Sequence, residues 1–559
     1  MARARLASQP VVNDPPLAPE LIHQLQASID LASHYHLTFQ LLESYTLLGE
    51  YYRRQTLLGK AWHAYTQAIL LLEDVRATLQ IDELQLGYLA DKATIYAQAI
   101  ALAYTSERTE QNLALLLYLF NLLAIAPLPT HASNNANPTD PQTQALIEEL
   151  QTLREAWQWQ QHKLTDPTNS IDATRMALGQ LEGQIADCQR RIRVRQQSDA
   201  SLTIAPRFGA DLPVEQAALA FYRGLQTKLA PHEAMLVYAK IDETLVVLVL
   251  RHTAGMVIPL GEFPAVEKLL ATWRFHVNDH ALIQQNPSLA QPMAKRILAA
   301  FHRALLAPLT VQLTDCAHLF VTLPPSLHDL PIAAFWNDGY LIEEYQLTYL
   351  SAPAALLKQQ PALIPTDQQH AVIIGHSHAG TLPHTVAEAK AVAAAVASYE
   401  HCDLFCDEEA HADAILAAST EATLLHIAAH AHFATTGPLF SAIHLADREL
   451  TLLELYHGAQ FHRHPLVVLS TCVSGQGTTR GGGLLGLARA FFAAGAGQLV
   501  VTLWRVDDES TATLMATMYR TLIASQPEVQ PGTALRQAQL AAAQTLHPLH
   551  WAGFCFIQG

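Results

Sequence analysis

The sequence predicts a multidomain protein with an α-helical N-terminal region and an α/β C-terminal domain built on a mostly parallel sheet. From Leu17 to about Ala126, apolar residues recur at three- and four-residue spacing, which is typical of amphipathic helices. From about Asp211, apolar runs of strand length alternate with helical segments, the pattern of a parallel sheet covered by helices. At 559 residues the chain also exceeds what one hydrophobic core supports.

The composition is that of a folded protein with an acidic surface. Half of the residues are hydrophobic and 15% are charged, with 34 basic against 50 acidic side chains and a net charge of −16. Such a charge repels phosphate backbones, so we expect no direct nucleic-acid partner. The six cysteines form no CxxC pair, which fits a reducing compartment. No sequence pattern calls for a cofactor.

The chain shows no targeting or membrane segment by pattern. Residues 1–16 are expected to form a loose leader, and they lack the apolar core of a signal peptide. The most apolar run, Leu113 to Ala126, contains Asn121 and is too short to span a membrane. We therefore expect a soluble, cytoplasmic protein with no membrane partner.

One structural repeat is legible within the helical region 17–126. Its positions are Leu48, Gly49, Tyr52, Ala61, Tyr65 and Ala68, with Tyr45 where an aromatic is usual. Small residues at this spacing let two helices approach closely, and aromatic rings fill the space beside them. The segment resembles a tetratricopeptide repeat (TPR). The resemblance implies a surface that binds a protein regulator or substrate. The two helices expected next, 82–103 and 108–125, keep the length without the signature.

The remaining segments are divided by composition. Residues 127–142 are rich in Pro, Asn, Thr and Ser and are expected to be a linker. Residues 143–200 predict a polar helical hairpin with solvated faces. The α/β domain is placed at 211–559, with an N-terminal subdomain 211–365 and a catalytic subdomain 366–559.

Two strings in the α/β domain each carry a reactive side chain at the end of an apolar run. LLHIAAHAHF contains His430, and PLVVLSTCVSGQG contains Cys472. In an open parallel sheet, ligands and chemistry lie outside the carboxyl ends of the strands. If the two strands are neighbours, the imidazole and the thiol share one edge of the sheet. An imidazole base beside a cysteine nucleophile is the minimal set for covalent catalysis.

Several strings together resemble the CHAT peptidases, which are caspase-like, related to separase, and often attached to TPR segments. The likeness runs from about residue 215 to the C-terminus. Its strings are Ser326-Leu-His-Asp-Leu-Pro-Ile-Ala-Ala, Glu388 after Leu382-Pro383, LHIAAHA, VLSTCVSGQG, GGGLLGLARAFFAAGAGQLVVTLWRVDDEST and HPLHWAGF. The resemblance implies a caspase-like sheet and a cysteine endopeptidase with the catalytic dyad His430 and Cys472. It also implies that backbone N–H groups of Ala431 and Cys472 hold the oxyanion.

Three positions depart from the family pattern. Ala431 replaces the usual Gly after the histidine, Val473-Ser474-Gly475 replaces Glu-Thr-Gly, and Pro324-Pro325 replaces Asp-Gly. If the backbone at Ala431 needs a positive φ, the alanine costs on the order of 1 kcal/mol. No departure removes a catalytic atom, but they bear on substrate preference.

Asp507 and Asp508 follow strand QLVVTLW and are the candidate substrate-binding residues. A carboxylate there could pair with a basic P1 side chain. The resemblance favours Asp508, because separases carry an acidic residue at that position. The alternative is a helix N-cap before DDESTATLMATMY. One residue could serve both purposes.

Other interpretations of the same residues stay open. Cys472 alone could be a buried core thiol. His426, four residues before His430 on the same strand, is expected to be a hydrogen-bonded core histidine, and His432 a loop residue. Gly481 to Gly483 lack the lysine of a phosphate loop and are expected to let the loop move under the substrate.

A zinc hydrolase is a further alternative, because imidazole and thiolate suit zinc. Its ligands would come from a group of histidines near the cysteine: His426, His430, His432, His462 and His464. Their spacing matches no usual zinc pattern, so we expect no metal. The alternative from a different class is a catalytically inactive CHAT/TPR scaffold for protein–protein interaction, which the substitution at Ala431 leaves open.

Overall fold

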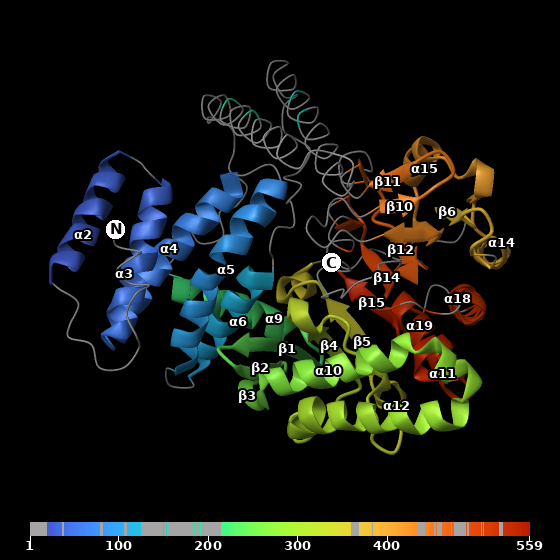
Figure 1. Cartoon of the computed structure of the whole chain (residues 1–559), viewed down its shortest axis with the longest axis horizontal. Helices are drawn as coiled ribbons and strands as arrows, with labels where there is room; N and C mark the ends of the chain where they lie inside the picture. The colour runs from blue at the N-terminus through green and yellow to red at the C-terminus, as the bar shows by residue number, and fades with distance from the viewer. Residues whose placement is uncertain are drawn as a thin grey trace, which may run out of the picture. The chain divides into compact units, whose positions relative to one another are not determined.

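The computed structural model (Figure 1) describes residues 19–35, 38–78, 82–105, 109–124, 214–358, 368–382, 384–432, 442–451, 454–455, 461–470, 472–473, 494–504, 508–524 and 529–559, with positions 149, 153, 184, 191, 488, 491, 492 and 506. The chain divides into two compact units, residues 1–129 with 212–559, and residues 130–211. The expected leader 1–16 and linker 127–142 lie outside the described residues. So does most of the hairpin 143–200, of which Glu149 and Arg191 form an ion pair at 3.1 Å.

The N-terminal region is helical, as the apolar periodicity predicts. Its helices are α2 (Pro19–His34), α3 (Thr38–Arg54), α4 (Leu58–Thr78), α5 (Asp82–Thr105) and α6 (Glu110–Ala124). Helix α6 is the most apolar, and its Asn121 is buried with its side-chain oxygen accepting a hydrogen bond from the backbone N–H of Ala354 at 2.8 Å. None of the described helices is long and apolar enough to cross a membrane.

The predicted repeat is the helix pair α3–α4. The ring of Tyr65 is fully buried and lies so close to Gly49 that a Cβ there would stand 2.8 Å from it. Ala61 and Ala68, on the same face of α4 as Tyr65, are fully buried too. The small residues therefore allow the close helix approach that the TPR pattern requires, and the prediction of a TPR-like pair is confirmed.

The C-terminal part is built on an 11-stranded sheet in the order β3-β2-β1-β4-β5-β15-β14-β12-β8-β6-β7. The strands are β1 (Glu233–Ile241), β2 (Thr244–Leu250), β3 (Gly255–Glu262), β4 (His318–Thr322), β5 (Gln346–Leu350), β6 (His370–Gly375), β7 (His401–Cys406), β8 (Leu424–Ala428), β12 (Leu466–Leu469), β14 (Gln498–Thr502) and β15 (Phe554–Gln558). Seven of the neighbouring pairs are parallel, and three are antiparallel. The mostly parallel sheet is confirmed.

The C-terminal strand β15 joins two halves of this sheet. It runs parallel to β5 on one side, with Ile557 opposite Tyr349, and antiparallel to β14 on the other. Strands β1–β5 lie on the first side of it and strands β6–β14 on the second. A strand from the end of the chain is therefore needed to connect the two halves.

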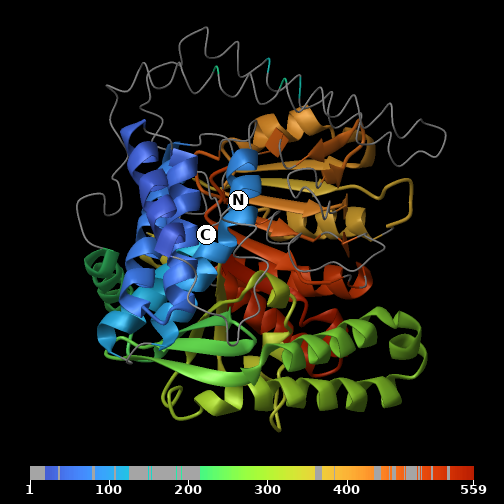
Figure 2. The ribbon, with the colours of Figure 1, turned by 60° about the vertical axis from the view of Figure 1, so that its left-hand side comes forward.

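Both faces of the sheet are buried, because successive side chains of a strand point to opposite faces. On β1, Leu236 and Tyr238 belong to one hydrophobic cluster that extends along the whole sheet. Met235 and Val237 face the other way, into a cluster shared with α4, α5 and α6. The N-terminal helices thus cover the first half of that face and share its core (Figure 2).

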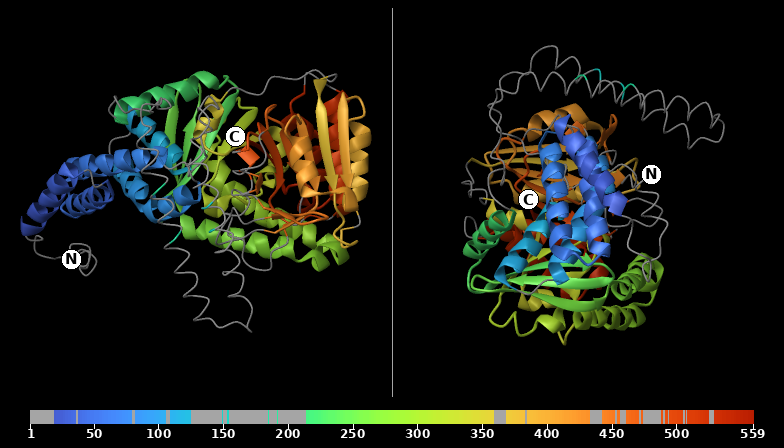
Figure 3. Two further views of the ribbon diagram at one scale, coloured as in Figure 1. Left: turned by 90° about the horizontal axis from the view of Figure 1, so that it is seen from above. Right: turned by 90° about the vertical axis from the view of Figure 1, so that its left-hand side faces the viewer.

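The other helices of the C-terminal part lie on both faces of the sheet (Figure 3). They are α9 (Val214–Lys228), α10 (Phe263–Asn278), α11 (His280–Gln285), α12 (Pro287–Phe301), α13 (Leu341–Glu344), α14 (Thr385–Ala395), α15 (Ala412–Ser419), α18 (Asp508–Ala524) and α19 (Pro531–Ala543). Buried residues of α10, α12, α14, α18 and α19 join the long cluster. Helix α15 belongs to a separate cluster on the opposite face of the second half.

A second, four-stranded sheet has the order β11-β10-β9-β13. Its strands are β9 (His430–His432), β10 (Ala442–His444), β11 (Glu449–Thr451) and β13 (Cys472–Val473). They are only two or three residues long, which is too short for an apolar period, and the sequence did not predict them. His432 is the last residue of β9 and pairs with Ala442, so the expectation that it is a loop residue is wrong.

Candidate active site

The candidate site lies at the carboxyl ends of three neighbouring strands of the large sheet. Strand β8 stands between β6 and β12, and all three are parallel. Backbone hydrogen bonds tie the segments that follow them: the N–H of His376 donates to the carbonyl of Ala428, and the N–H of Ser470 to that of Ile427, each at 2.9 Å. Three loops therefore leave the sheet side by side.

The backbones of His430 and Cys472 are directly paired in the small sheet. Strand β9 runs parallel to β13, with His430 opposite Cys472 and Ala431 opposite Val473. Neighbouring strands lie about 4.8 Å apart, so this register brings the two backbones into contact. Both residues continue from strands that are themselves neighbours, β8 and β12. The structure therefore brings together the two residues that the sequence singled out.

The imidazole of His430 is surrounded by a loop and two further histidines. Its Nε2 atom lies 3.4 Å from the hydroxyl oxygen of Thr381. The ring of His378 meets it edge-on, with centroids 5.1 Å apart at 87°. The ring of His444, on β10, lies 6.4 Å from it and 5.2 Å from that of His378.

Charges at the edge of this group come from two carboxylates. Asp407, directly after β7, accepts a hydrogen bond from the N–H of Ser377 at 2.7 Å, which holds the pKa of its carboxyl below the usual value. Burial lowers the pKa of His376, although the nearby Asp407 opposes that effect. The carboxylate of Glu449 lies 3.2 Å from Nδ1 of His444. Around the candidate base, then, imidazoles predominate, and the two carboxylates contact the neighbouring residues Ser377 and His444.

His426 is a buried, partnered histidine, as predicted. It is fully buried on β8, its Nδ1 is 3.1 Å from the hydroxyl of Tyr519, and its Nε2 is 3.2 Å from Glu388. Strand β8 ends at Ala428, so His426 and His430 do not share one continuous strand, in contrast to the sequence-based expectation. These contacts join β8 to Glu388 on α14 and to Tyr519 on α18. The loop at 376–382 precedes α14, and Asp508 is the first residue of α18.

Ala431 does not carry the backbone strain considered above. It lies in β9, is buried, and is not among the described residues with a positive φ. An alanine therefore replaces glycine here without the cost of a left-handed conformation.

The other candidate residues are placed only in part. Asp508 is the first residue of α18, directly beyond β14, whereas Asp507 and Gly481 to Gly483 lie outside the described residues. His462 pairs with Glu421 at 2.8 Å, and His464 with the carbonyl of Gly495 at 2.9 Å, each at the surface. In the described part of the chain, no group of three or more His, Cys, Asp or Glu residues is placed to hold a metal ion.

Sequence reasoning missed the residues that surround His430, namely His376, His378, Thr381 and His444. The first three follow strand β6, which ends at Gly375, so the rule that chemistry lies beyond strand ends applied to them as well. What the sequence lacked was the strand order, because nothing in it shows that β6 is the neighbour of β8.

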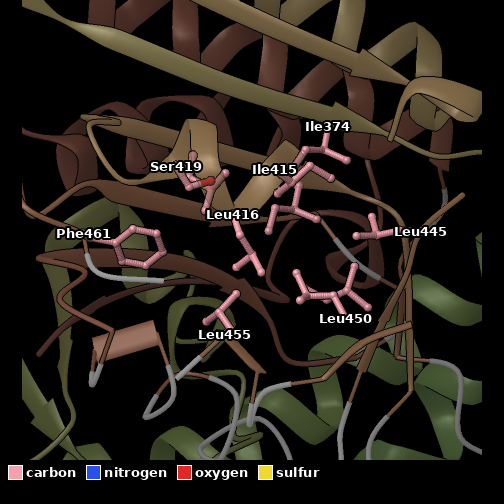
Figure 4. A pocket seen from close by; sticks show the side chains of 11 residues that line it. Ile374, Ile415, Leu416, Ser419, Leu445, Leu450, Leu455 and Phe461 are labelled. Atoms are coloured by element: carbon pink, nitrogen blue, oxygen red, sulfur yellow. The ribbon is translucent and has the colours of Figure 1, made fainter. Parts of the chain in front are cut away.

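An apolar pocket lies beneath the small sheet (Figure 4). Its lining is aliphatic and aromatic apart from one serine: Ile374, Ile415, Leu416, Ser419, Leu425, Ile427, Ile443, Leu445, Leu450, Leu455 and Phe461. The hydroxyl of Ser419 is buried without a hydrogen-bond partner among the described residues. Since no imidazole, thiol or charged side chain is in this lining, the pocket belongs to the packing that supports β10 and β11.

Comparison with known families identifies the C-terminal part. Residues 295–559 match the family described as CHAT domain, the family that the sequence motifs indicated. The match contains both His430 and Cys472. It begins later than residue 211, so β1–β3 and α10 precede the matched range.

Individual relatives are more distant. A stretch of 93 residues is 36% identical to tetratricopeptide repeat protein 28 of Mus musculus and covers 16% of this chain and 4% of that protein. Two structures of the Saccharomyces cerevisiae separase–securin complex match 93% and 97% of this chain at 11% identity and a TM-score of 0.42. The matches span 52% and 49% of those chains.

A complex of the Porphyromonas gingivalis RgpB pro- and mature domains matches 47% of this chain and 68% of that chain. The identity is 9% and the TM-score 0.33. Structural similarity at this level does not indicate a shared activity.

Proposed function

We propose that the protein is a cysteine endopeptidase whose catalytic dyad is His430 and Cys472. The observation that carries the proposal is the register of β9 and β13, in which these two residues stand opposite each other. Their location within a CHAT domain supports the same conclusion. Imidazole beside thiol is sufficient for nucleophilic catalysis, because the imidazole takes the thiol proton and generates the reactive thiolate.

In the proposed reaction, the thiolate of Cys472 attacks the carbonyl carbon of the scissile peptide bond. The C–N bond breaks with a proton donated by His430 to the leaving amine, and water then hydrolyses the thioester with His430 as base. The proposed oxyanion donors are the backbone N–H groups of Cys472 and Ala431. Removal of one such donor typically lowers the rate a hundredfold or more.

The proposed substrate is a protein cleaved after a defined residue. Asp508, at the start of α18 beyond β14, is the preferred candidate for binding a basic P1 side chain, with Asp507 beside it. A specific peptidase joined to TPR-like helices fits a regulatory task in the cytoplasm, such as defence or cell-death signalling. This last step rests on family analogy.

The dyad is tested with an electrophilic peptide probe that forms a thioether with a reactive cysteine. We expect labelling of the wild type and none of Cys472→Ala, with strongly reduced labelling of His430→Gln. Cys402→Ala is the matched control, because Cys402 is an exposed thiol outside the site and its loss should change nothing. Equal labelling of wild type and Cys472→Ala would refute the dyad and leave an inactive scaffold.

The substrate is identified by mapping new protein N-termini in cells that express the wild type or Cys472→Ala. Cleavage sites present only with the wild type define the substrate and its P1 residue. If P1 is basic, Asp508→Asn should reduce cleavage while leaving probe labelling by a small, uncharged electrophile intact.

We propose that the TPR-like helices bind the protein regulator or substrate through α2 and the α3–α4 pair. Leu31 and Tyr35 are 60% and 62% exposed on and just after α2, and Leu57 and Leu58 are exposed just before and at the start of α4. The double variant Leu31→Ser/Tyr35→Ser should reduce cleavage of the mapped substrate in cells but not labelling of Cys472. Unchanged cleavage would place recognition elsewhere.

A further inference from the structure

The loop 376–382, hereafter the β6 loop, is held firmly against the candidate base. It begins at the end of β6 and is attached to β8 through the N–H of His376, which donates to the carbonyl of Ala428 at 2.9 Å. Asp407 holds it from the other side, by accepting from the N–H of Ser377 at 2.7 Å. Within the loop, the N–H of Leu382 donates to the carbonyl of Ser377 at 3.0 Å. These bonds fix the loop backbone at both ends.

Three consecutive residues of the β6 loop have a left-handed backbone: His378, Ala379 and Gly380, with φ of 49°, 55° and 83°. A non-glycine residue in this region costs on the order of 1 kcal/mol. The conformation turns the chain so that both His378 and Thr381 reach His430. Strain kept in a loop that borders a candidate active site indicates that the direction of these side chains matters.

The hydrogen bonds of Thr381 have a defined direction. Its hydroxyl is 3.0 Å from the carbonyl oxygen of His378, which can only accept, so the hydroxyl proton points there. The hydroxyl oxygen of Thr381 also lies 3.4 Å from Nε2 of His430. Because its own proton is engaged by the carbonyl, this oxygen must accept a hydrogen bond from an Nε2–H. In a neutral imidazole only one ring nitrogen carries a proton. This bond therefore leaves Nδ1 as the basic nitrogen of His430.

The ring of His378 limits the orientation of the same imidazole. It stands nearly perpendicular to the ring of His430, with centroids 5.1 Å apart, and also contacts the ring of His444 at 5.2 Å. Nδ1 of His430 is buried in this arrangement.

We propose that Thr381 and His378 are positioning residues that select the Nε2–H tautomer of His430 and present Nδ1 to the Cys472 thiol. The proposal rests on the proposed dyad and adds an orienting group that the sequence did not reveal. Thr381 acts through His430 and does not touch the reacting atoms. Both positioning side chains are exposed, so they can be replaced without opening a core.

The tautomer is tested by nitrogen NMR of protein labelled with ¹⁵N-histidine, in a Cys472→Ala background and at about pH 8. The signals of His430 are identified by their loss in His430→Gln. We expect a protonated Nε2 and an unprotonated Nδ1, a mixture of tautomers in Thr381→Val, and the original pattern in Thr381→Ser. Thr272→Val is the matched control, because its exposed hydroxyl donates to the carbonyl of Lys268, far from the site in sequence. A proton on Nδ1, or an unchanged spectrum in Thr381→Val, would overturn the proposal.

A second measurement separates this proposal from the dyad itself. The rate of alkylation of Cys472 by iodoacetamide at neutral pH should fall about tenfold in Thr381→Val, the factor that one hydrogen bond of ordinary strength supplies. It should recover in Thr381→Ser. If His430→Gln leaves the rate unchanged, the dyad is wrong, whatever the NMR result. If His430→Gln slows alkylation but Thr381→Val does not, the dyad stands and the positioning role is wrong.

Discussion

A buried pair of histidines makes the stability of the α/β part depend on pH. His276, on α10, and His547, before the C-terminal strand, are 3% and 8% exposed, and their Nε2 atoms lie 3.2 Å apart. Burial lowers the pKa of His547 to about 4, and the charges of His276 and His550 act in the same direction. Burial lowers the pKa of His276 as well. The folded protein therefore holds this pair neutral.

The size of the effect follows from linkage. An unfolded histidine has a pKa of about 6.5, so between about pH 6.5 and 4 the unfolded chain binds a proton that His547 in the folded protein does not. The stabilisation is fully present above pH 6.5 and is lost as the pH falls. For His547 alone the loss is about 2 kcal/mol at pH 5 and approaches about 3.4 kcal/mol at lower pH.

The assay is urea denaturation of the wild type and His547→Asn between about pH 8 and 5. Asparagine preserves an acceptor for the N–H of Leu549, which now donates to Nδ1 of His547 at 3.1 Å. The variant should be less stable at pH 8, and its deficit should shrink by about 2 kcal/mol on going to pH 5. A deficit that is the same at every pH would refute the reasoning. His252→Asn, in an exposed turn, controls for general effects of the substitution.

Two further variants test packing in the N-terminal pair and behind the candidate site. Gly49→Ala should lower the free energy of unfolding by about 1–3 kcal/mol, because the added Cβ meets the buried ring of Tyr65. Gly59→Ala is the control and should have no such cost, because a Cβ there has nothing within 4 Å. Equal effects of the two variants in a thermal melt would contradict this. Tyr519→Phe should cost about 1–2 kcal/mol in urea denaturation, because it removes the hydroxyl beside Nδ1 of the buried His426; an unchanged midpoint would show that the contact contributes nothing.

Much of the fold could be predicted because it depends on local patterns. Apolar spacing located the N-terminal helical region and most strands of the large sheet, and the small residues Gly49 and Ala61 revealed the close α3–α4 pair. His430 and Cys472 could be singled out because each follows an apolar run at a place where parallel sheets carry chemistry. The CHAT motifs then named the family that the C-terminal match confirms.

The strand order could not be predicted, since it depends on which apolar faces bury each other across hundreds of residues. The insertion of β15 between the two halves and the packing of the N-terminal helices on β1 are decided by the complementary faces of the assembled sheet. The small sheet leaves no pattern, because two or three residues show no period.

The sequence by itself determined which residues carry the candidate chemistry, because that depends on side-chain type and on position after a strand. Only the tertiary structure decided their neighbours. Pairing of β9 with β13 brings His430 beside Cys472, and the position of β6 next to β8 delivers Thr381 to the imidazole. Such contacts join segments about forty to fifty residues apart, and their geometry arises only when the sheet closes around a common core.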